Sequence, residues 1–230
     1  MCIRDSNELS DALTEIRETG LSQRGDITIA CVPTVGVHYL PRILRAFSEH
    51  RPHDRVKILD HASASVLQAV LRREAEFGIS IAGDQHPELV SVPLTSDPYV
   101  LVCRDDHPLA KRRRIRWQAL QPHPLIFAGE VSGNRSLLDG ALKASGVTLH
   151  SFYEVQRSST ALGLVAEGLG AAVVPRLAMQ KNAYPMIRTV ELVEPEVSRT
   201  LVLVTRKAAQ LSPAARALYD RIVDGATSVK

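Results

Sequence analysis

Short apolar runs alternate with helix-length segments from residue 27 onward, and this alternation limits the possible folds more than any other feature of the chain. Residues 27–32, 56–59 and 77–81 have the length and composition of buried strands. The segments 34–49 and 63–73, which lie between them, have the length of helices. The order strand, helix, strand, helix, strand is typical of an open parallel sheet with helices on its faces.

The same order begins again in the second half of the chain. Residues 124–127, 153–155 and 171–174 are predicted strands, and residues 134–146 and 160–168 are predicted helices. Two copies of one unit predict an α/β protein with two Rossmann-like lobes. Aromatic residues make up only 4% of the sequence although 45% is hydrophobic, so the cores must be built from aliphatic side chains, as in parallel sheets.

The end of the chain is expected to return to the first lobe. A strand at 99–103 interrupts the first unit, and a strand at 201–204 followed by a helix at 213–223 closes the chain after the second unit. We therefore predict two lobes with these bounds: lobe I, residues 25–97 together with 206–226, and lobe II, residues 98–205.

Residues 1–24 precede this order. Leu9, Leu13 and Ile16 have the spacing of an amphipathic helix, which we interpret as the remnant of a longer linker helix after a non-native or disordered start at residues 1–6. The segment is charged and broken, unlike a secretory signal peptide. No apolar stretch approaches the ~20 residues that span a bilayer. We expect a cytoplasmic protein without membrane contact.

No arrangement of residues indicates catalysis. Gly168 and Gly170 match only the beginning of a dinucleotide-binding fingerprint, and a strand follows where that motif requires a helix. The eight histidines include no i, i+4 pair of a zinc-binding helix. Cys31 and Cys103 lie inside apolar runs, where a free thiol is usually buried. We therefore predict no catalytic residues, no metal and no cofactor, and we do not expect an enzyme.

The basic run at residues 111–116 is the one segment that suggests nucleic acid. Its sequence, KRRRIR, has no interleaved aromatic residue or glycine, and the formal net charge of the whole chain is only +3. A solvated loop and helix start is the favoured interpretation.

Polar residues stand at the predicted helix starts, just beyond the ends of strands. They are Thr34, Ser63, Asn134 and, in the run 158–160, Ser158. Open α/β sheets bind ligands in this crevice, and helix N-termini attract carboxylates and other small anions. Arg135 or Arg157 is placed to add a bidentate clamp. Simple N-capping is the alternative for any one of these residues, but their convergence from both lobes favours a ligand cleft.

Eight segments, weak singly but in a distinctive order, resemble the effector-binding domain of LysR-type transcriptional regulators between residues 24 and about 223. In chain order they are 25–30 (GDITIA), 40–44 (LPRIL), 76–79 (EFGI), 97–102 (DPYVLV), 106–110 (DHPLA), 154–155 (EV), 161–175 (ALGLVAEGLGAAVVP) and 211–215 (LSPAA).

The resemblance implies a fold like that of type 2 periplasmic binding proteins, with two lobes joined by two crossover strands and an effector bound between them. By position it implies effector contacts at Thr34, Val35, Ser63, Gly133, Asn134 and Arg135. Many family members have a different residue at the position of Arg135, so the role of Arg135 is inferred from its charge.

The resemblance also implies partners. Family domains pair side by side, so we expect a homodimer or tetramer through contacts between lobe I and lobe II. A full regulator begins with a winged helix-turn-helix and a linker helix, of which only residues 7–19 would be present here. DNA binding is therefore expected only through the missing N-terminal domain.

These observations lead to one hypothesis and two alternatives. The hypothesis is an effector sensor that binds a small, anionic metabolite between its lobes and repositions attached DNA-binding domains. One alternative is a solute-binding protein of a transport system, which shares the fold; the absence of a signal-peptide pattern and the DHPLA segment argue against it. The other is an enzyme on the same scaffold, which would need an accessible nucleophile or a cofactor attachment.

Overall fold

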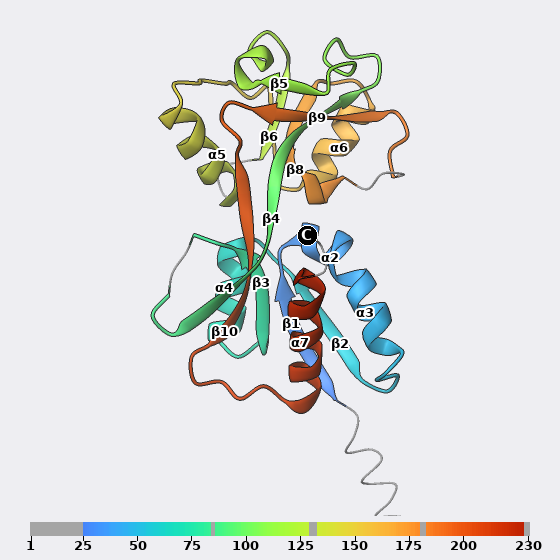
Figure 1. The fold of residues 1–230 in the computed structure, drawn as a ribbon, viewed down its shortest axis with the longest axis vertical. Coiled ribbons are helices and arrows are strands. Elements are labelled where there is room, and N and C mark those ends of the chain that lie inside the picture. The colour runs from blue at the N-terminus through green and yellow to red at the C-terminus, as the bar shows by residue number, and fades with distance from the viewer. Residues whose placement is uncertain (1–24, 84–85, 129–132, 180–182, 228–230) are drawn as a thin grey trace, which may run out of the picture.

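Two α/β lobes are stacked along the long axis of the molecule (Figure 1). The computed structural model describes residues 25–83, 86–128, 133–179 and 183–227. Residues 1–24, where the remnant of a linker helix was predicted, lie outside the described residues. Within the described part of the chain, no helix has both the length and the apolar character needed to cross a membrane.

The first lobe is built on parallel strands in the order β2-β1-β3, with β10 added antiparallel beside β3. The elements of this lobe are β1 (Asp26–Cys31), α2 (Pro33–His38), α3 (Leu40–Ser48), β2 (Arg55–Asp60), α4 (Ser63–Leu71), β3 (Phe77–Ile81) and α7 (Pro213–Thr227). This is the strand–helix alternation predicted for residues 27–81.

The second lobe repeats this arrangement with parallel strands in the order β8-β6-β7. Its elements are β5 (Arg114–Arg116), a 3₁₀ turn (Trp117–Leu120), β6 (Leu125–Ala128), α5 (Gly133–Ala144), β7 (Tyr153–Val155), α6 (Ser158–Ala166), β8 (Ala171–Pro175), a second 3₁₀ turn (Arg176–Ala178) and β9 (Ile187–Val193).

Two long antiparallel strands, β4 (Leu89–Arg104) and β10 (Ser198–Arg206), run between the lobes (Figure 1). The part of β4 up to Pro98 pairs with β10, and the part from Tyr99 onward pairs with β8 and β9. The register of the β4–β10 pair shifts between Leu201 and Val202, and such bulges bend a strand. The predicted fold, two Rossmann-like lobes joined by two crossover strands, is confirmed.

Three predicted elements differ from the structure. The helix predicted at 34–49 is two helices that meet at Tyr39, because Pro41 has no N–H for a helical hydrogen bond across the junction. The strand predicted at 99–103 is the second part of the 16-residue β4. The helix start expected within 111–116 is instead strand β5. In addition to these three differences, strand β9 was not predicted.

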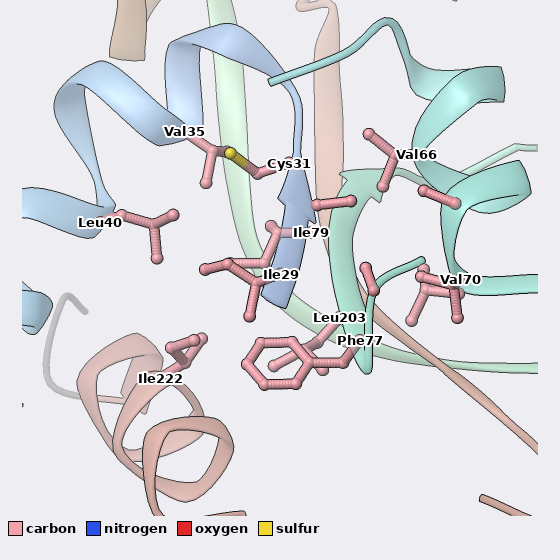
Figure 2. Packing of buried hydrophobic residues seen from close by; sticks show 14 of the residues in the cluster. Ile29, Cys31, Val35, Leu40, Val66, Val70, Phe77, Ile79, Leu203 and Ile222 are labelled. Atoms are coloured by element: carbon pink, nitrogen blue, oxygen red, sulfur yellow. The ribbon is translucent and has the colours of Figure 1, made fainter. Parts of the chain in front are cut away.

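Each lobe has its own core. The first core joins β1 and β3 to α2, α4 and α7, with Ile29, Phe77 and Ile222 packed together (Figure 2). In the second lobe two clusters cover the two faces of the sheet. Residues 201–204 belong to the first core although the predicted bounds place them in lobe II. The packing therefore favours a lobe boundary before residue 201.

One glycine brings α4 close to the sheet. A Cβ at Gly78 in β3 would lie 2.7 Å from Cγ1 of Val66 in α4, closer than side chains pack. Glycine thus allows α4 to lie directly on β3. As a result, the first residue of α4, Ser63, lies beside Ser80 of β3 at the edge of the space between the lobes.

Candidate ligand-binding cleft

A cavity of about 140 Å³ lies between the two lobes, at the carboxyl ends of parallel strands from both. This is the position at which open α/β sheets bind ligands. The cavity is lined by Val32, Pro33, Thr34, Ala62, Ser63, Ile81, Asn134, Gln156, Arg157, Ser158 and Arg199.

Two helices, one from each lobe, begin at this cavity without a side-chain cap. The N-cap of α4 is Ala62 and that of α6 is Arg157, and neither side chain hydrogen-bonds to the first turn of its helix. Both N-cap residues line the cavity. The first amides of a helix need acceptors and carry a partial positive charge. These helix starts can therefore provide N–H donors to a bound anion.

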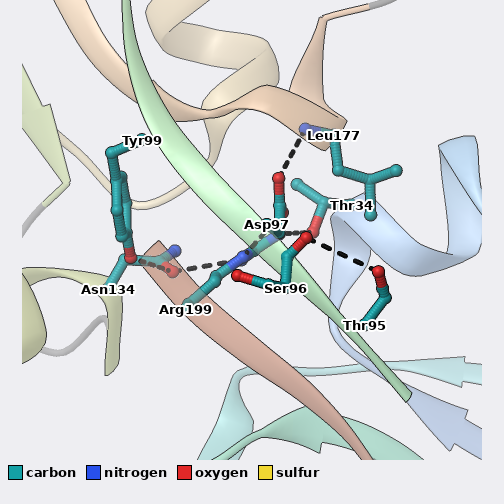
Figure 3. A network of polar contacts seen from close by, with 8 residues as sticks. All are labelled: Thr34, Thr95, Ser96, Asp97, Tyr99, Asn134, Leu177 and Arg199. Atoms are coloured by element: carbon teal, nitrogen blue, oxygen red, sulfur yellow. Dashed lines mark hydrogen bonds and ion pairs between the residues drawn. The ribbon is translucent and has the colours of Figure 1, made fainter. Parts of the chain in front are cut away.

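Arg199 forms the inner end of the cavity, where it is 1% exposed and lies at the centre of a hydrogen-bond network (Figure 3). Its Nε and Nη2 donate to Oδ2 of Asp97 at 2.9 and 2.8 Å. Nη2 also donates to Oγ1 of Thr34 at 2.8 Å, and Nη1 donates to Oδ1 of Asn134 at 3.0 Å. The guanidinium is therefore neutralised by Asp97 and bound to both lobes.

Two further donors complete the network. The hydroxyl of Tyr99 donates to Oδ1 of Asn134 at 2.9 Å, and the backbone N–H of Leu177 donates to Oδ1 of Asp97 at 2.9 Å. Burial raises the pKa of Tyr99 well above its usual value, so its hydroxyl stays protonated and able to donate. The acceptor oxygens around Arg199 are thus already used by the protein.

Ser63 is held by a buried neighbour. Its Oγ lies 2.7 Å from Oγ of the fully buried Ser80, and the hydroxyl of Ser80 can also donate to the carbonyl of Ser63 at 3.4 Å. When Ser80 donates to Ser63 Oγ, the hydrogen of Ser63 is free to point at the cavity. Ser63 is then a fixed donor to a ligand.

Arg157 gives the cavity its exposed positive charge. Its side chain is 56% exposed, and Nη1 lies 3.8 Å from Oδ2 of Asp60, at the end of β2 in the opposite lobe. Among the described residues, Arg157 and Arg199 are the charged residues of the lining, which contains no carboxylate. Because Asp97 neutralises Arg199, the positive charge of the lining that favours an anion comes from Arg157.

Four of the predicted site residues line this cavity: Thr34, Ser63, Asn134 and Ser158. Gly133 is the first residue of α5, and Val35 is fully buried in the first core. Arg135 is directed elsewhere: Nε lies 2.8 Å from both carboxylate oxygens of Asp139, and the guanidinium lies over Phe127. It lines a separate cavity behind α5 rather than the cleft.

Sequence reasoning missed Arg199 and Asp97. Asp97 is followed by the apolar run 98–103, and Arg199 stands two residues before the apolar run 201–204. An ionised side chain that is buried beside such a run requires a partner of opposite charge. Asp97 was noticed only as part of the DPYVLV segment. An arginine and an aspartate, each just before an apolar strand, are a signal that could have suggested a buried pair.

The two cysteines in the described residues are not placed as nucleophiles. Burial raises the pKa of Cys31 to about 12 and of Cys103 to about 11, and for Cys31 the nearby carboxylate of Asp60 adds to the effect. Both thiols are buried and protonated near neutral pH. Within the same described part of the chain, no group of three or more metal-ligating side chains occurs.

The local structure explains two features of the sequence, the basic run at residues 111–116 and the glycine at position 168. Arg114 and Arg116 of the basic run form ion pairs with Glu191 and Glu194, at 2.9 and 2.8 Å, so their charges are balanced within the second lobe. The helix predicted to end at Gly168 ends at Ala166, with Glu167 as its C-cap. Gly168 follows with a φ of +78°, as is typical of a glycine just after a helix end.

A two-lobed α/β fold with a charged cavity between the lobes defines a domain that binds small ligands. Residues 21–227 match the family described as LysR substrate binding domain. The chain belongs to this family, which confirms the resemblance found in the sequence.

The curated relatives agree with this assignment. The chain is 38% identical over 217 residues to the uncharacterized HTH-type transcriptional regulator YbhD of Escherichia coli (strain K12), an alignment that covers 94% of this chain and 68% of the relative. It is 30% identical to the uncharacterized HTH-type transcriptional regulator YfeR of Shigella flexneri, with coverage of 95% and 70%. The chain is therefore similar to transcriptional regulators.

Solved structures confirm the fold. The effector-binding domain of QuiR in complex with shikimate superposes with a TM-score of 0.80 at 22% identity, covering 90% of this chain and 99% of that one. The CcmR regulatory domain of Synechocystis in complex with 2-PG also has a TM-score of 0.80, at 20% identity and the same coverage. At these identities the likeness concerns the fold alone.

Proposed function

We propose that this domain senses a small anionic metabolite bound in the cleft between its lobes. One observation carries the proposal: α4 and α6, from opposite lobes, direct uncapped N-termini at a single cavity lined by arginines and, among the described residues, by no carboxylate. Unpaired helix amides and positive charge together favour a negatively charged ligand.

The size of the cavity limits the ligand. About 140 Å³ is below the range of roughly 300–1,000 Å³ that is typical of pockets for drug-sized molecules. A compact metabolite with one carboxylate or phosphate fits this description. Its anionic group would accept from the amides of α6 and from Arg157, and a polar group at its other end would meet Ser63.

The two ligand-bound neighbours support an anionic ligand. The QuiR domain was solved with shikimate, which carries a carboxylate, and the CcmR domain with 2-PG. In the present chain the proposed ligand contacts are Arg157, Ser63 and Ser158, which line the cavity.

The proposed response is a change in lobe arrangement. A ligand shifts a conformational equilibrium only when it binds one arrangement more tightly than the other. Contacts to both lobes across one cavity provide that difference. The shift would pass to helix-turn-helix domains in the intact, cytoplasmic regulator, which we expect to be a homodimer or tetramer and to contact DNA through those domains. No reaction is proposed at the cleft.

Calorimetric titration of the chain tests the proposal. The probes are shikimate and 2-PG, with the methyl ester of shikimate as the neutral comparison. At least one anion is expected to bind and to raise the melting temperature, while the ester does not. Ser63→Ala removes one hydrogen bond and should weaken that binding about two- to tenfold, from a net loss of about 0.5–1.5 kcal/mol.

A matched control lies two residues further along α4. Ser65 is exposed and does not line the cavity, so Ser65→Ala should leave the affinity unchanged. Equal losses in the two variants, or ester binding as tight as acid binding, would overturn the assignment of the cleft as an anion site.

A further inference from the structure

Arg199 is placed where both lobes and both connecting strands meet. It is paired across the β4–β10 ladder with Asp97, so the two charges sit side by side on the two strands that join the lobes. Burying an ion pair removes water from both charges, and an apolar pair of similar volume often stabilises a fold as well or better. Folding alone therefore does not explain why this position holds a guanidinium.

The hydrogen-bond geometry suggests a different role. A guanidinium has five N–H donors in a rigid plane. Asp97 holds one edge of that plane through Nε and Nη2. The remaining contacts diverge: Nη2 reaches Thr34 in the first lobe, and Nη1 reaches Asn134 at the start of α5 in the second (Figure 3). One rigid group thus fixes the position of each lobe relative to the connecting strands.

We propose that Arg199 is a positioning residue that sets the angle between the two lobes, and with it the width of the cleft. Asp97 anchors the guanidinium, and Thr34 and Asn134 are the points at which it holds the first and second lobe. Tyr99, which donates to the same oxygen of Asn134, keeps that acceptor in place.

The role of Arg199 would also link ligand binding to lobe movement, a step that rests on the proposed function. Arg199 lines the cavity, and its two terminal nitrogens are the ones bound to Thr34 and Asn134. An acceptor oxygen at the polar end of the ligand that reached these nitrogens would compete with both lobe contacts at once. Thr34 and Asn134 would then act in the cleft through Arg199.

The proposal is tested without any ligand, by measuring the distance between the lobes. Spin labels are placed on exposed residues of opposite lobes, at Arg72→Cys in the first and Lys143→Cys in the second. Cys31 and Cys103 are buried and will not be labelled, and Cys2→Ser removes the third thiol. Double electron–electron resonance then gives the distribution of inter-lobe distances.

Thr34→Val and Asn134→Ala each release one lobe while the Arg199–Asp97 pair remains. In both variants the most populated distance should shift by about 2 Å or more, or the distribution should broaden to that extent, the scale of domain rearrangements in proteins. Arg199→Lys keeps the charge but not the planar fork, so it should give the same result.

The control is Thr95→Val on the same connecting strand, a position where the hydroxyl only meets the carbonyl of Ser96 at 3.5 Å. It should leave the distribution unchanged. Distributions of Thr34→Val and Asn134→Ala that superpose on that of the parent chain would overturn the proposal, as would an equal shift in Thr95→Val. Because no ligand is present, failure to bind anions would leave this result untouched.

Discussion

The inner end of the cleft and its mouth each contain an arginine, and the protein uses the two differently. Arg199 is 1% exposed, paired with a buried carboxylate and bonded to both lobes. Arg157 is 56% exposed, and its Nη1 lies 3.8 Å from Oδ2 of Asp60. The first guanidinium donates four hydrogen bonds to groups of the fold, whereas the second is exposed to solvent at the cavity. We therefore propose that the arginine at the inner end of the cleft mainly holds the fold and that the arginine at the mouth mainly recognises the ligand.

The largest expected effect is the loss of the carboxylate at the inner end. Asp97→Ala leaves the buried charge of Arg199 without a counter-ion and removes the acceptor of the Leu177 N–H. Breaking a buried pair in this way costs about 3–5 kcal/mol of unfolding free energy. Chemical denaturation followed by circular dichroism measures it.

The matched control for this change is an exposed pair in the second lobe. Asp106→Ala removes the exposed partner of Arg104, so the unfolding midpoint should not change measurably. If Asp97→Ala unfolds at the same denaturant concentration as the parent chain, water must reach Arg199 and solvate its charge. The contrast between a buried Arg199 and an exposed Arg157 would then be wrong.

The second expected effect is on affinity at the mouth. Arg157→Ala should weaken binding of an anionic probe about tenfold, because one charge-assisted hydrogen bond to a partly exposed group contributes about 1.4 kcal/mol. Stability should hardly change, since Arg157 makes little contact with the fold. Calorimetry and denaturation of the same variant measure both quantities.

Arg112→Ala is the control for this substitution. Arg112 is exposed in the second lobe and does not line the cavity, so the affinity should stay at its original value. An unchanged affinity in Arg157→Ala would show that the mouth of the cleft, where Arg157 lies, is not part of the anion site.

Removing the negative charge of Asp60 is expected to change the affinity for an anion less than Arg157→Ala does, and in the opposite direction. Its carboxylate competes with an anionic ligand for Arg157 across the two lobes. Exposed ion pairs contribute about 0.2–1 kcal/mol, so Asp60→Asn should tighten anion binding by at most about fivefold. In the Arg157→Ala background the gain should disappear; an undiminished gain there would show that Asp60 acts only through the general charge of the cleft.

The difference between the two arginines also shows what the sequence reveals and what it does not. The apolar periodicity predicted both lobes, and the polar helix starts predicted Thr34, Ser63, Asn134 and Ser158, which line one cavity. These are local signals. The burial of Arg199 depends on Asp97, 102 positions away in the chain. A charged residue beside an apolar run can suggest a buried pair, but the local pattern does not identify the partner.

Two further differences have equally physical causes. Strand β9 lacks a strict alternation of buried and exposed residues, because Arg188 and Thr189 are both exposed between the buried Ile187 and Val190, so the period-two pattern of a strand is broken. Arg135 follows Asn134 directly on α5, and consecutive helical residues point about 100° apart. Since Asn134 is bonded to Arg199 at the cleft, its neighbour must point elsewhere. Charge alone suggested Arg135 as the clamp, and in this structure helix geometry directs it to another cavity.

The smallest expected effect on affinity belongs to Arg135. In Arg135→Ala, anion binding should stay within about twofold, because the side chain lines the cavity behind α5. Stability should fall by about 0.5–1 kcal/mol through the loss of the Asp139 pair and of the contact over Phe127. Calorimetry and denaturation separate the two quantities. A loss of affinity as large as that of Arg157→Ala would mean that Arg135 turns into the cleft when a ligand binds, and that the mouth of the cleft has two recognition arginines, not one.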